Sequence, residues 1–127
     1  MLISLLKSKI HRATVTEARV DYVGSITIDK DLLEEAGMIG FEKVLVVSLD
    51  TGERLETYII EGERQSREIC LNGAAAKVMN KGEKIIIMSF CFLTEKQAEN
   101  FKPKIVHVDE NNNIKKGILT SENNEEC

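Results

Sequence analysis

The chain has 127 residues, of which 43% are hydrophobic and 30% charged, and its net charge is −4. This length suits one domain, its apolar runs are too short to span a membrane, and its acidic balance argues against a nucleic-acid binder, which needs clustered Lys and Arg. Three cysteines without a CxxC spacing predict reduced thiols in a cytoplasmic protein. Only 5% of the residues are aromatic, so we expect a core of Ile, Leu and Val, which favours strands.

Short strands dominate the predicted secondary structure. Alternation and turn residues predict strands, in chain order, at 9–20, 26–28, 44–47, 54–60, 69–71, 84–93 and 105–108. The turn Asp50–Thr51–Gly52 predicts that 44–47 and 54–60 pair as a hairpin. A helix at 30–36 is predicted from the capping residue Asp29 and the stop residue Gly37. Thr94 and Gln97 form a capping box for another helix, which ends before Pro103. Strand 84–93 is the most apolar run, and we expect it at the centre of the sheet.

Many short strands with a few short helices indicate a mainly β fold. We expect a small closed β-barrel over residues 1–108, because closure removes exposed strand edges. From residue 109 to residue 127 the sequence is polar and rich in asparagine, which is typical of a disordered tail.

Most familiar kinds of catalytic site find no support in the sequence. His11 and His107 are the only histidines and lack metal-ligand spacing, so we expect no metal site. His11 is interpreted first as a surface or rim residue of its strand. Cys70 lies between two apolar residues and is interpreted as a core thiol. The chain has no glycine-rich phosphate loop and no GxSxG nucleophile motif.

The segment Tyr22–Val23–Gly24–Ser25 is the remaining motif. A Gly-Ser pair after a strand is usually an ordinary turn. Glycine also permits strained dihedral angles that bring the following hydroxyl against the preceding carbonyl carbon. Attack by the Ser25 hydroxyl on the Gly24 carbonyl would convert the amide into an ester. Both interpretations are open from these residues alone.

Five short motifs occur in order along the chain: Lys9–Arg12, Tyr22–Ser25, Arg54 with Thr57–Tyr58, Glu63–Arg64 and Asn72–Ala76. Together they resemble the pyruvoyl-dependent aspartate decarboxylase family over residues 1–108. The resemblance implies a six-stranded double-psi β-barrel that assembles as a homotetramer, with sites between protomers. It also implies conversion of L-aspartate to β-alanine and CO2 for pantothenate biosynthesis.

The resemblance further implies that the chain is a precursor that cuts itself between Gly24 and Ser25, into residues 1–24 and 25–127. Ser25 would become a pyruvoyl group, the covalent cofactor, which forms a Schiff base with L-aspartate and accepts the electrons released with CO2. Thr57 would stabilise the oxyanion formed during cleavage. From the residues alone, Thr57 would be an ordinary strand threonine.

The same resemblance implies roles in substrate binding. Arg54 would pair with a substrate carboxylate, Lys9 would add positive charge, and Tyr58 would return a proton to the carbanion. Hydrogen bonds to the substrate or to the pyruvoyl carbonyl are implied for Asn72, Gly73, Ala74 and Ala75. Further pocket candidates by position are His11, Tyr22 and Ile86. Without the resemblance, Arg54 would be a surface charge and Tyr58 a packing residue.

Two features complicate this interpretation. Thr57 and Tyr58 are adjacent, so a regular strand would direct their side chains to opposite faces. Many family members carry tryptophan where this chain has Val47, which implies a smaller pocket wall here. The alternative function is a non-catalytic double-psi barrel that binds or assembles without being processed, and the acidic charge disfavours a DNA-binding barrel.

Overall fold

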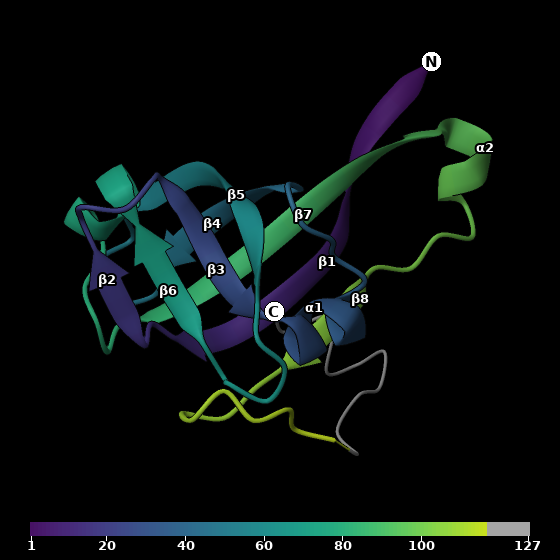
Figure 1. Cartoon of the computed structure of the whole chain (residues 1–127). Helices are drawn as coiled ribbons and strands as arrows, with labels where there is room; N and C mark the ends of the chain where they lie inside the picture. The colour runs from purple at the N-terminus through teal and green to yellow at the C-terminus, as the bar shows by residue number, and fades with distance from the viewer. Residues whose placement is uncertain (117–127) are drawn as a thin grey trace.

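Strands make up most of the regular structure in residues 1–116, the part of the chain that this computed structural model describes (Figure 1). The strands are β1 (Leu2–Thr14), β2 (Glu17–Arg19), β3 (Ser25–Asp29), β4 (Lys43–Ser48), β5 (Arg54–Gly62), β6 (Ile69–Asn72), β7 (Lys84–Thr94) and β8 (Lys104–His107). The helices are α1 (Lys30–Ala36), α2 (Glu95–Ala98) and a 3₁₀ helix, Gly73–Lys77. The predicted mainly β class is therefore confirmed.

The strands follow the order β2-β6-β3-β5-β4-β7-β1-β8. β7 lies between β4 and β1, as expected for the most apolar segment, and it pairs antiparallel with both. β4 and β5 form the predicted antiparallel hairpin. β3 runs parallel to β5 and antiparallel to β6, so it joins the two halves of the sheet.

The predicted strand at 9–20 differs from the structure, which divides this segment into β1 and β2. Val15 exchanges backbone hydrogen bonds with Gly82 and Glu83, whereas Thr16 bonds to Ile69 of β6. The chain thus leaves β7 and joins β6 at this corner, which ends the first strand. β1 also begins earlier than predicted, because Leu2 onward pairs with the far half of β7.

Aliphatic side chains fill the core, as the composition predicts. β1, β4 and β7 each direct alternate residues inward, among them Ile10, Val46 and Ile87, which are fully buried. The neighbouring residues along the same strands lie on the opposite face of the sheet. None of the helices in residues 1–116 has the length and apolar character that crossing a membrane requires.

Helix α1 has the predicted ends and is anchored by its cap. Asp29 accepts a hydrogen bond from the Asp31 amide at 2.8 Å, and Gly37 ends the helix with φ of 71°. Asp29 also accepts from the Gln65 amide and from both the amide and the guanidinium of Arg67. One buried carboxylate therefore holds α1 and the loop before β6 together.

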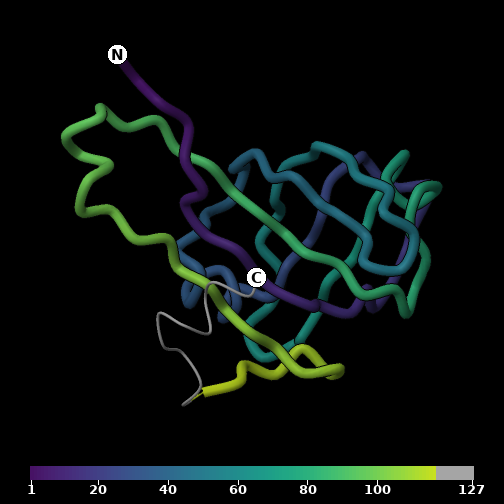
Figure 2. The backbone as a smooth tube through the Cα atoms, turned by 180° about the vertical axis from the view of Figure 1, so that it is seen from behind, coloured from purple at the N-terminus to yellow at the C-terminus, as the bar shows by residue number. Residues whose placement is uncertain are grey.

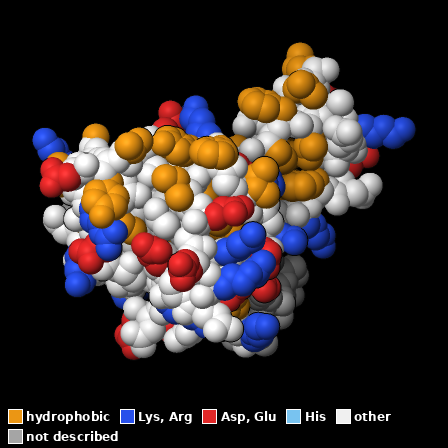
Figure 3. Space-filling view, viewed as in Figure 1, with side chains coloured by type: hydrophobic (Ala, Val, Ile, Leu, Met, Phe, Trp, Pro, Cys, Tyr) orange, Lys and Arg blue, Asp and Glu red, His pale blue; other side chains and the backbone are white. Residues whose placement is uncertain are grey.

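The long β1–β7 pair extends beyond the rest of the sheet and leads to α2 (Figure 2). Helix α2 begins at the predicted capping box and ends at Ala98, before Pro103 as predicted. Leu2, Phe90 and Phe92 are exposed on this ribbon, and Figure 3 shows apolar side chains gathered over it.

Residues 109–116 belong to the segment that the sequence assigns to a tail. Asn112 is fully buried there, accepts a hydrogen bond from the Thr14 amide at 2.7 Å, and donates to the carbonyls of Thr14 and Arg67. Val108 and Ile114 form a β-bridge. The expected disorder at 117–127 concerns residues outside those described.

Candidate active site

Ser25 is the first residue of β3, and its side chain is fully buried. Its hydroxyl donates to the Val23 carbonyl at 3.2 Å and accepts from Asn72 Nδ2 at 3.0 Å. The same amide nitrogen lies 3.0 Å from Thr27 Oγ1. The Ser25 hydroxyl is therefore held on both sides, next to the peptide bond that links it to Gly24.

Strand register brings Asn72 and Tyr58 to either side of Ser25. Asn72 is the antiparallel partner of Ser25 across β3 and β6. On the other side, Ile26 pairs with Ile59 in the parallel β3–β5 ladder, so Ser25 lies level with Tyr58. Residues distant in sequence thus meet at the start of β3.

Gly73 approaches the backbone of the Gly24 segment very closely. A Cβ added to Gly73 would lie 2.6 Å from both Cα and N of Gly24 and 2.8 Å from the Tyr22 carbonyl oxygen. Gly73 also has φ of +65°, in the left-handed region that glycine adopts without strain. Only a glycine at position 73 leaves room for the chain before Ser25.

A cavity of about 380 Å³ opens beside Gly24 and is called the serine pocket below. Its lining residues are Gly24, Leu55, Glu56, Thr57, Tyr58, Ala74, Ala75 and Val78. This size suits a small metabolite. The small side chains of Ala74 and Ala75 keep the cavity open on the side of the 3₁₀ helix.

Thr57 and Tyr58 both border the serine pocket although they face opposite sides of β5. Thr57 is the partner of Val44, a core residue, whereas Tyr58 pairs with the exposed Lys43. The β3 ladder starts at Ile59, so residues 54–58 leave one strand edge without a β3 partner, and the pocket lies along that edge. Both residues can therefore border one pocket although their side chains face opposite sides of the strand.

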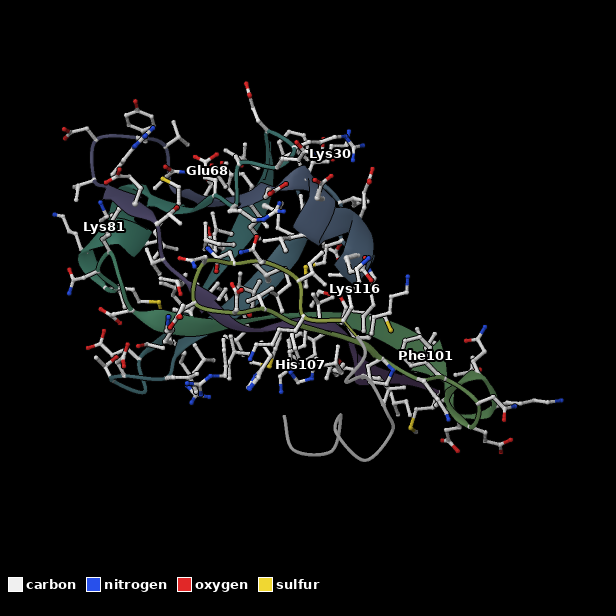
Figure 4. All side chains as sticks on the ribbon, turned by 90° about the horizontal axis from the view of Figure 1, so that it is seen from below. Lys30, Glu68, Lys81, Phe101, His107 and Lys116 are labelled. Atoms are coloured by element: carbon white, nitrogen blue, oxygen red, sulfur yellow. The ribbon has the colours of Figure 1, made fainter. Side chains whose placement is uncertain are left out.

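A second group of predicted residues lies on the outer face of the sheet and is called the outer row below. Its members are successive partners across β8, β1, β7, β4 and β5, namely His107, His11, Ile86, Val47 and Arg54. Lys9 lies two residues before His11 on the same face. In Figure 4, His107 lies on one side of the β1–β7 ribbon and α1 on the other.

The outer row is electrostatically positive at its β1 end. Burial is the main cause that lowers the pKa of His11 from 6.5 to about 4, and the charges of Lys9, His107, Arg12 and Lys115 contribute to the same shift. His11 Nδ1 is buried and has no hydrogen-bond partner among the described residues. His11 is thus neutral at pH 7 within a surrounding of cations, a setting that favours an anionic ligand.

The structure therefore brings together some of the predicted residues and separates others. Gly24, Thr57, Tyr58, Ala74 and Ala75 line the serine pocket. Ser25, Asn72 and Gly73 lie next to this lining, through the Asn72–Ser25 hydrogen bond and the close approach of Gly73 to Gly24. Arg54, Lys9, His11 and Ile86 do not line the pocket. Tyr22 is 57% exposed. Cζ of Arg19 lies over the Tyr22 ring, 5.2 Å from the ring centroid.

Three neighbours of these residues are not among the site residues predicted from the sequence. Cys70 and Thr27 contact the Asn72 amide, and their positions two residues from Asn72 and Ser25 along each strand could have indicated a shared face. Phe41 stacks on the Tyr58 ring with centroids 6.3 Å apart. Its loop position gives no such signal.

Comparison with known proteins agrees with the motifs. The family model described as aspartate decarboxylase matches residues 1–115. A protein of Caldicellulosiruptor saccharolyticus named aspartate 1-decarboxylase is 58% identical over 127 residues, which cover all of this chain and 98% of the relative. Proteins of the same name from Clostridium botulinum and Clostridium kluyveri are 59% and 55% identical and are covered to 91% and 90% of their lengths.

These matches cover nearly the whole chain at high identity. The chain belongs to the aspartate decarboxylase family. The resemblance inferred from the five motifs is confirmed.

Proposed function

We propose that this protein is a self-processing carboxy-lyase that converts L-aspartate to β-alanine and CO2, a step of pantothenate biosynthesis. Its electron sink would be a pyruvoyl group made from Ser25. The observation that carries this proposal is the buried Ser25 hydroxyl, held by Asn72 beside Gly24 and next to an open pocket. Membership of the aspartate decarboxylase family supports the same reaction.

Self-cleavage begins with attack of Ser25 Oγ on the Gly24 carbonyl carbon. The Ser25 nitrogen leaves that carbon and takes up the hydroxyl proton, which gives an ester and a free amine. Loss of the Ser25 α-proton then breaks the ester Cβ–O bond and releases Gly24 as a carboxylate. Water hydrolyses the remaining dehydroalanine to a ketone and ammonia. Residues 1–24 and 25–127 become separate chains.

Several contacts support this sequence of steps. The Asn72 amide and the Val23 carbonyl fix the hydroxyl position. Thr57 lines the same pocket as Gly24 and is the donor we assign to the oxyanion. Gly73 permits the close approach of the chain that is cut.

The site fits a pyruvoyl group at position 25. Ser25 lies at the junction of three strands, where Asn72 Nδ2 already donates to its side-chain oxygen. Asn72 and Thr57, with the backbone amides of Gly73, Ala74 and Ala75, would hold the group and the bound substrate. A pyruvoyl ketone supplies an electron-withdrawing centre for the electron pair left when the α-carboxylate departs. Tyr58, level with Ser25, would donate the proton that replaces CO2.

Substrate carboxylates require cations, and these lie on the outer row. Arg54 would bind a carboxylate through its planar fork, with Lys9 adding positive charge. Arg54 is four residues from Tyr58 along β5, about 13 Å at the rise of a strand. This spacing leaves Arg54 outside the lining of the serine pocket in its own protomer. It supports a site completed by Arg54 and Lys9 of a second copy, with His11, Ile86 and Val47 around them and Tyr22 near the entrance.

We further propose a closed six-stranded double-psi β-barrel over residues 1–108, assembled as a homotetramer. Closure is supported by the corner at Val15 and Thr16, which hydrogen-bonds to the segment before β7 and to β6. The apolar ribbon surface formed by Leu2, Phe90 and Phe92 supports contacts between protomers. A cytoplasmic location, without nucleic-acid or membrane partners, belongs to the same proposal.

Intact mass spectrometry tests the proposal directly. We expect wild-type protein to separate into residues 1–24 and residues 25–127, the latter blocked to N-terminal sequencing, and to release CO2 from L-aspartate. Ser25→Ala should remain one chain and release none. Retained activity in Ser25→Ala would refute the mechanism. A wild-type chain that stays uncut after long incubation would favour a non-catalytic binding module.

A further inference from the structure

Cys70 contacts the amide that holds Ser25. Cys70 and Asn72 are two residues apart on β6 and share a face, on which they are the partners of Thr27 and Ser25. Cys70 Sγ lies 3.3 Å from Asn72 Oδ1, and Asn72 Nδ2 lies 3.0 Å from Ser25 Oγ. A continuous chain of hydrogen bonds therefore runs from the thiol through the amide to the hydroxyl.

The direction of this chain depends on which end of the amide faces Ser25. The Ser25 hydroxyl gives its own proton to the Val23 carbonyl, so its lone pairs require a donor. Asn72 supplies a donor only if its nitrogen, and not its oxygen, points to Ser25. A thiol that donates to Asn72 Oδ1 favours this orientation over the one rotated by 180°.

The Cys70 thiol is suited to donate. Its side chain is 1% exposed, and burial raises the pKa of the thiol, with smaller opposing and reinforcing effects from Arg19, Glu68 and Glu17. The sulfur therefore keeps its proton at neutral pH. It lies behind the amide, on the side away from Ser25, and forms no contact with the bond to be cut.

We propose that Cys70 is a positioning residue for self-cleavage, since its S–H group orients the Asn72 amide toward the Ser25 hydroxyl. This inference rests on the proposed cleavage between Gly24 and Ser25. Cys70 itself forms no covalent bond and transfers no proton in the reaction. Cys70, which the sequence alone indicates as a core thiol, would thus also assist the maturation of the protein.

Three substitutions separate orientation from packing. Cys70→Val keeps an apolar side chain, larger by about one methyl group, and removes the donor. Cys70→Ser keeps a donor and loses volume, and Cys70→Ala loses similar volume without a donor. We expect freshly made Cys70→Val and Cys70→Ala to be cut about five- to tenfold more slowly than wild type, the effect of one lost hydrogen bond. Cys70→Ser should be cut within about twofold of the wild-type rate, because a hydroxyl can replace the thiol as donor.

The rates are measured as the uncut fraction against time by intact mass spectrometry, with thermal unfolding recorded for each variant. Cys91→Ala, which removes a half-buried thiol of β7, is the matched control and should be cut at the wild-type rate. A packing role would give the opposite order, with Cys70→Val fast and Cys70→Ser slow, and that result would overturn the inference. If Cys70→Val does not fold, equal rates for Cys70→Ser and Cys70→Ala would overturn it. A wild-type chain that is not cut would instead refute the proposed function.

Discussion

Gly73 packs against Gly24 so closely that no side chain fits between the two backbones. The gap from an added Gly73 Cβ to Gly24 Cα would be 2.6 Å, well inside van der Waals contact. This contact lies beside the bond that we expect to be cut. The conformation of the Gly24 segment is therefore set from outside, by the turn that follows β6.

Gly73→Ala should slow self-cleavage by at least tenfold, because the methyl group would push the Gly24 segment away from Ser25. Its left-handed φ adds about 1 kcal/mol of destabilisation. Gly52→Ala is the matched control, since Gly52 has φ of +79° and no atom within 4 Å of its added Cβ. It should lose similar stability in urea unfolding and keep the wild-type cleavage rate. Equal cleavage in both variants would show that the glycine contact is irrelevant to processing.

Arg54→Ala should lower kcat/KM for L-aspartate by about 100-fold, the effect of losing a charge-assisted carboxylate contact. Cleavage should continue at the wild-type rate, because Arg54 does not line the serine pocket. Arg64→Ala is the control: Arg64 pairs with Asp31 and Glu34 on α1. It should leave both rates unchanged. Steady-state CO2 release measures the effect, and an unaltered kcat/KM for Arg54→Ala would rule out its assigned role.

Asp29→Ala should destabilise the folded chain by about 2–4 kcal/mol, because it removes the α1 cap and the acceptor of the Arg67 amide and guanidinium. It also removes one of the two carboxylates that accept from the Gln65 amide, the other being Asp31. Asp31→Ala, which removes a half-exposed carboxylate from the same helix, should lose less than about 1 kcal/mol. Urea unfolding of the two variants distinguishes these values. Similar losses in both would mean that the Asp29 hydrogen bonds contribute little.

Acid should destabilise the protein partly through His11. Because burial and nearby cations lower the pKa of His11 to about 4 from 6.5, the unfolded chain binds the proton more readily than the folded chain. Stability from the neutral imidazole is fully present above pH 6.5 and is lost as the pH falls toward 4. We expect wild type to lose about 1 kcal/mol more than His11→Gln between pH 7 and pH 4, after allowance for solvent screening at this half-buried site. Identical pH profiles in urea unfolding would contradict this expectation.

Local signals predicted local structure well. Asp29 and Gly37 gave the bounds of α1, and the Asp50–Gly52 turn gave the β4–β5 hairpin, because capping and turn geometry depend on a few adjacent residues. The change of partner at Val15 could not be predicted, since it depends on Glu83 and Ile69 far along the chain. The Asn112 contacts with Thr14 and Arg67 are equally non-local. The prediction of a tail from residue 109 rested on composition alone, which carries no information about such contacts.

The same contrast applies to the site. Gly24 and Ser25 are recognisable as a motif in the sequence. The residues that contact them are set by strand register, which the sequence does not reveal. The β3–β6 pairing places Asn72 and Cys70 opposite Ser25 and Thr27. Arg54 of the outer row and Tyr58 of the serine pocket share one face of β5, so their four-residue distance along the strand separates these two residues.

The strand order has a consequence for the timing of maturation. Residues 1–24 contain β1, which lies between β7 and β8, and β2, which pairs with β6. After a cut before Ser25, residues 1–24 would stay paired with the strands of residues 25–127, chiefly through the β1–β7 ladder, the longest of the described sheet. Folding of the uncut chain is unimolecular, whereas reassembly of the two pieces would require them to collide and would depend on their concentration. Under the proposed cleavage, the chain would therefore have to fold before it is cut, and a processed molecule that unfolds could refold only by reassembly of its two pieces.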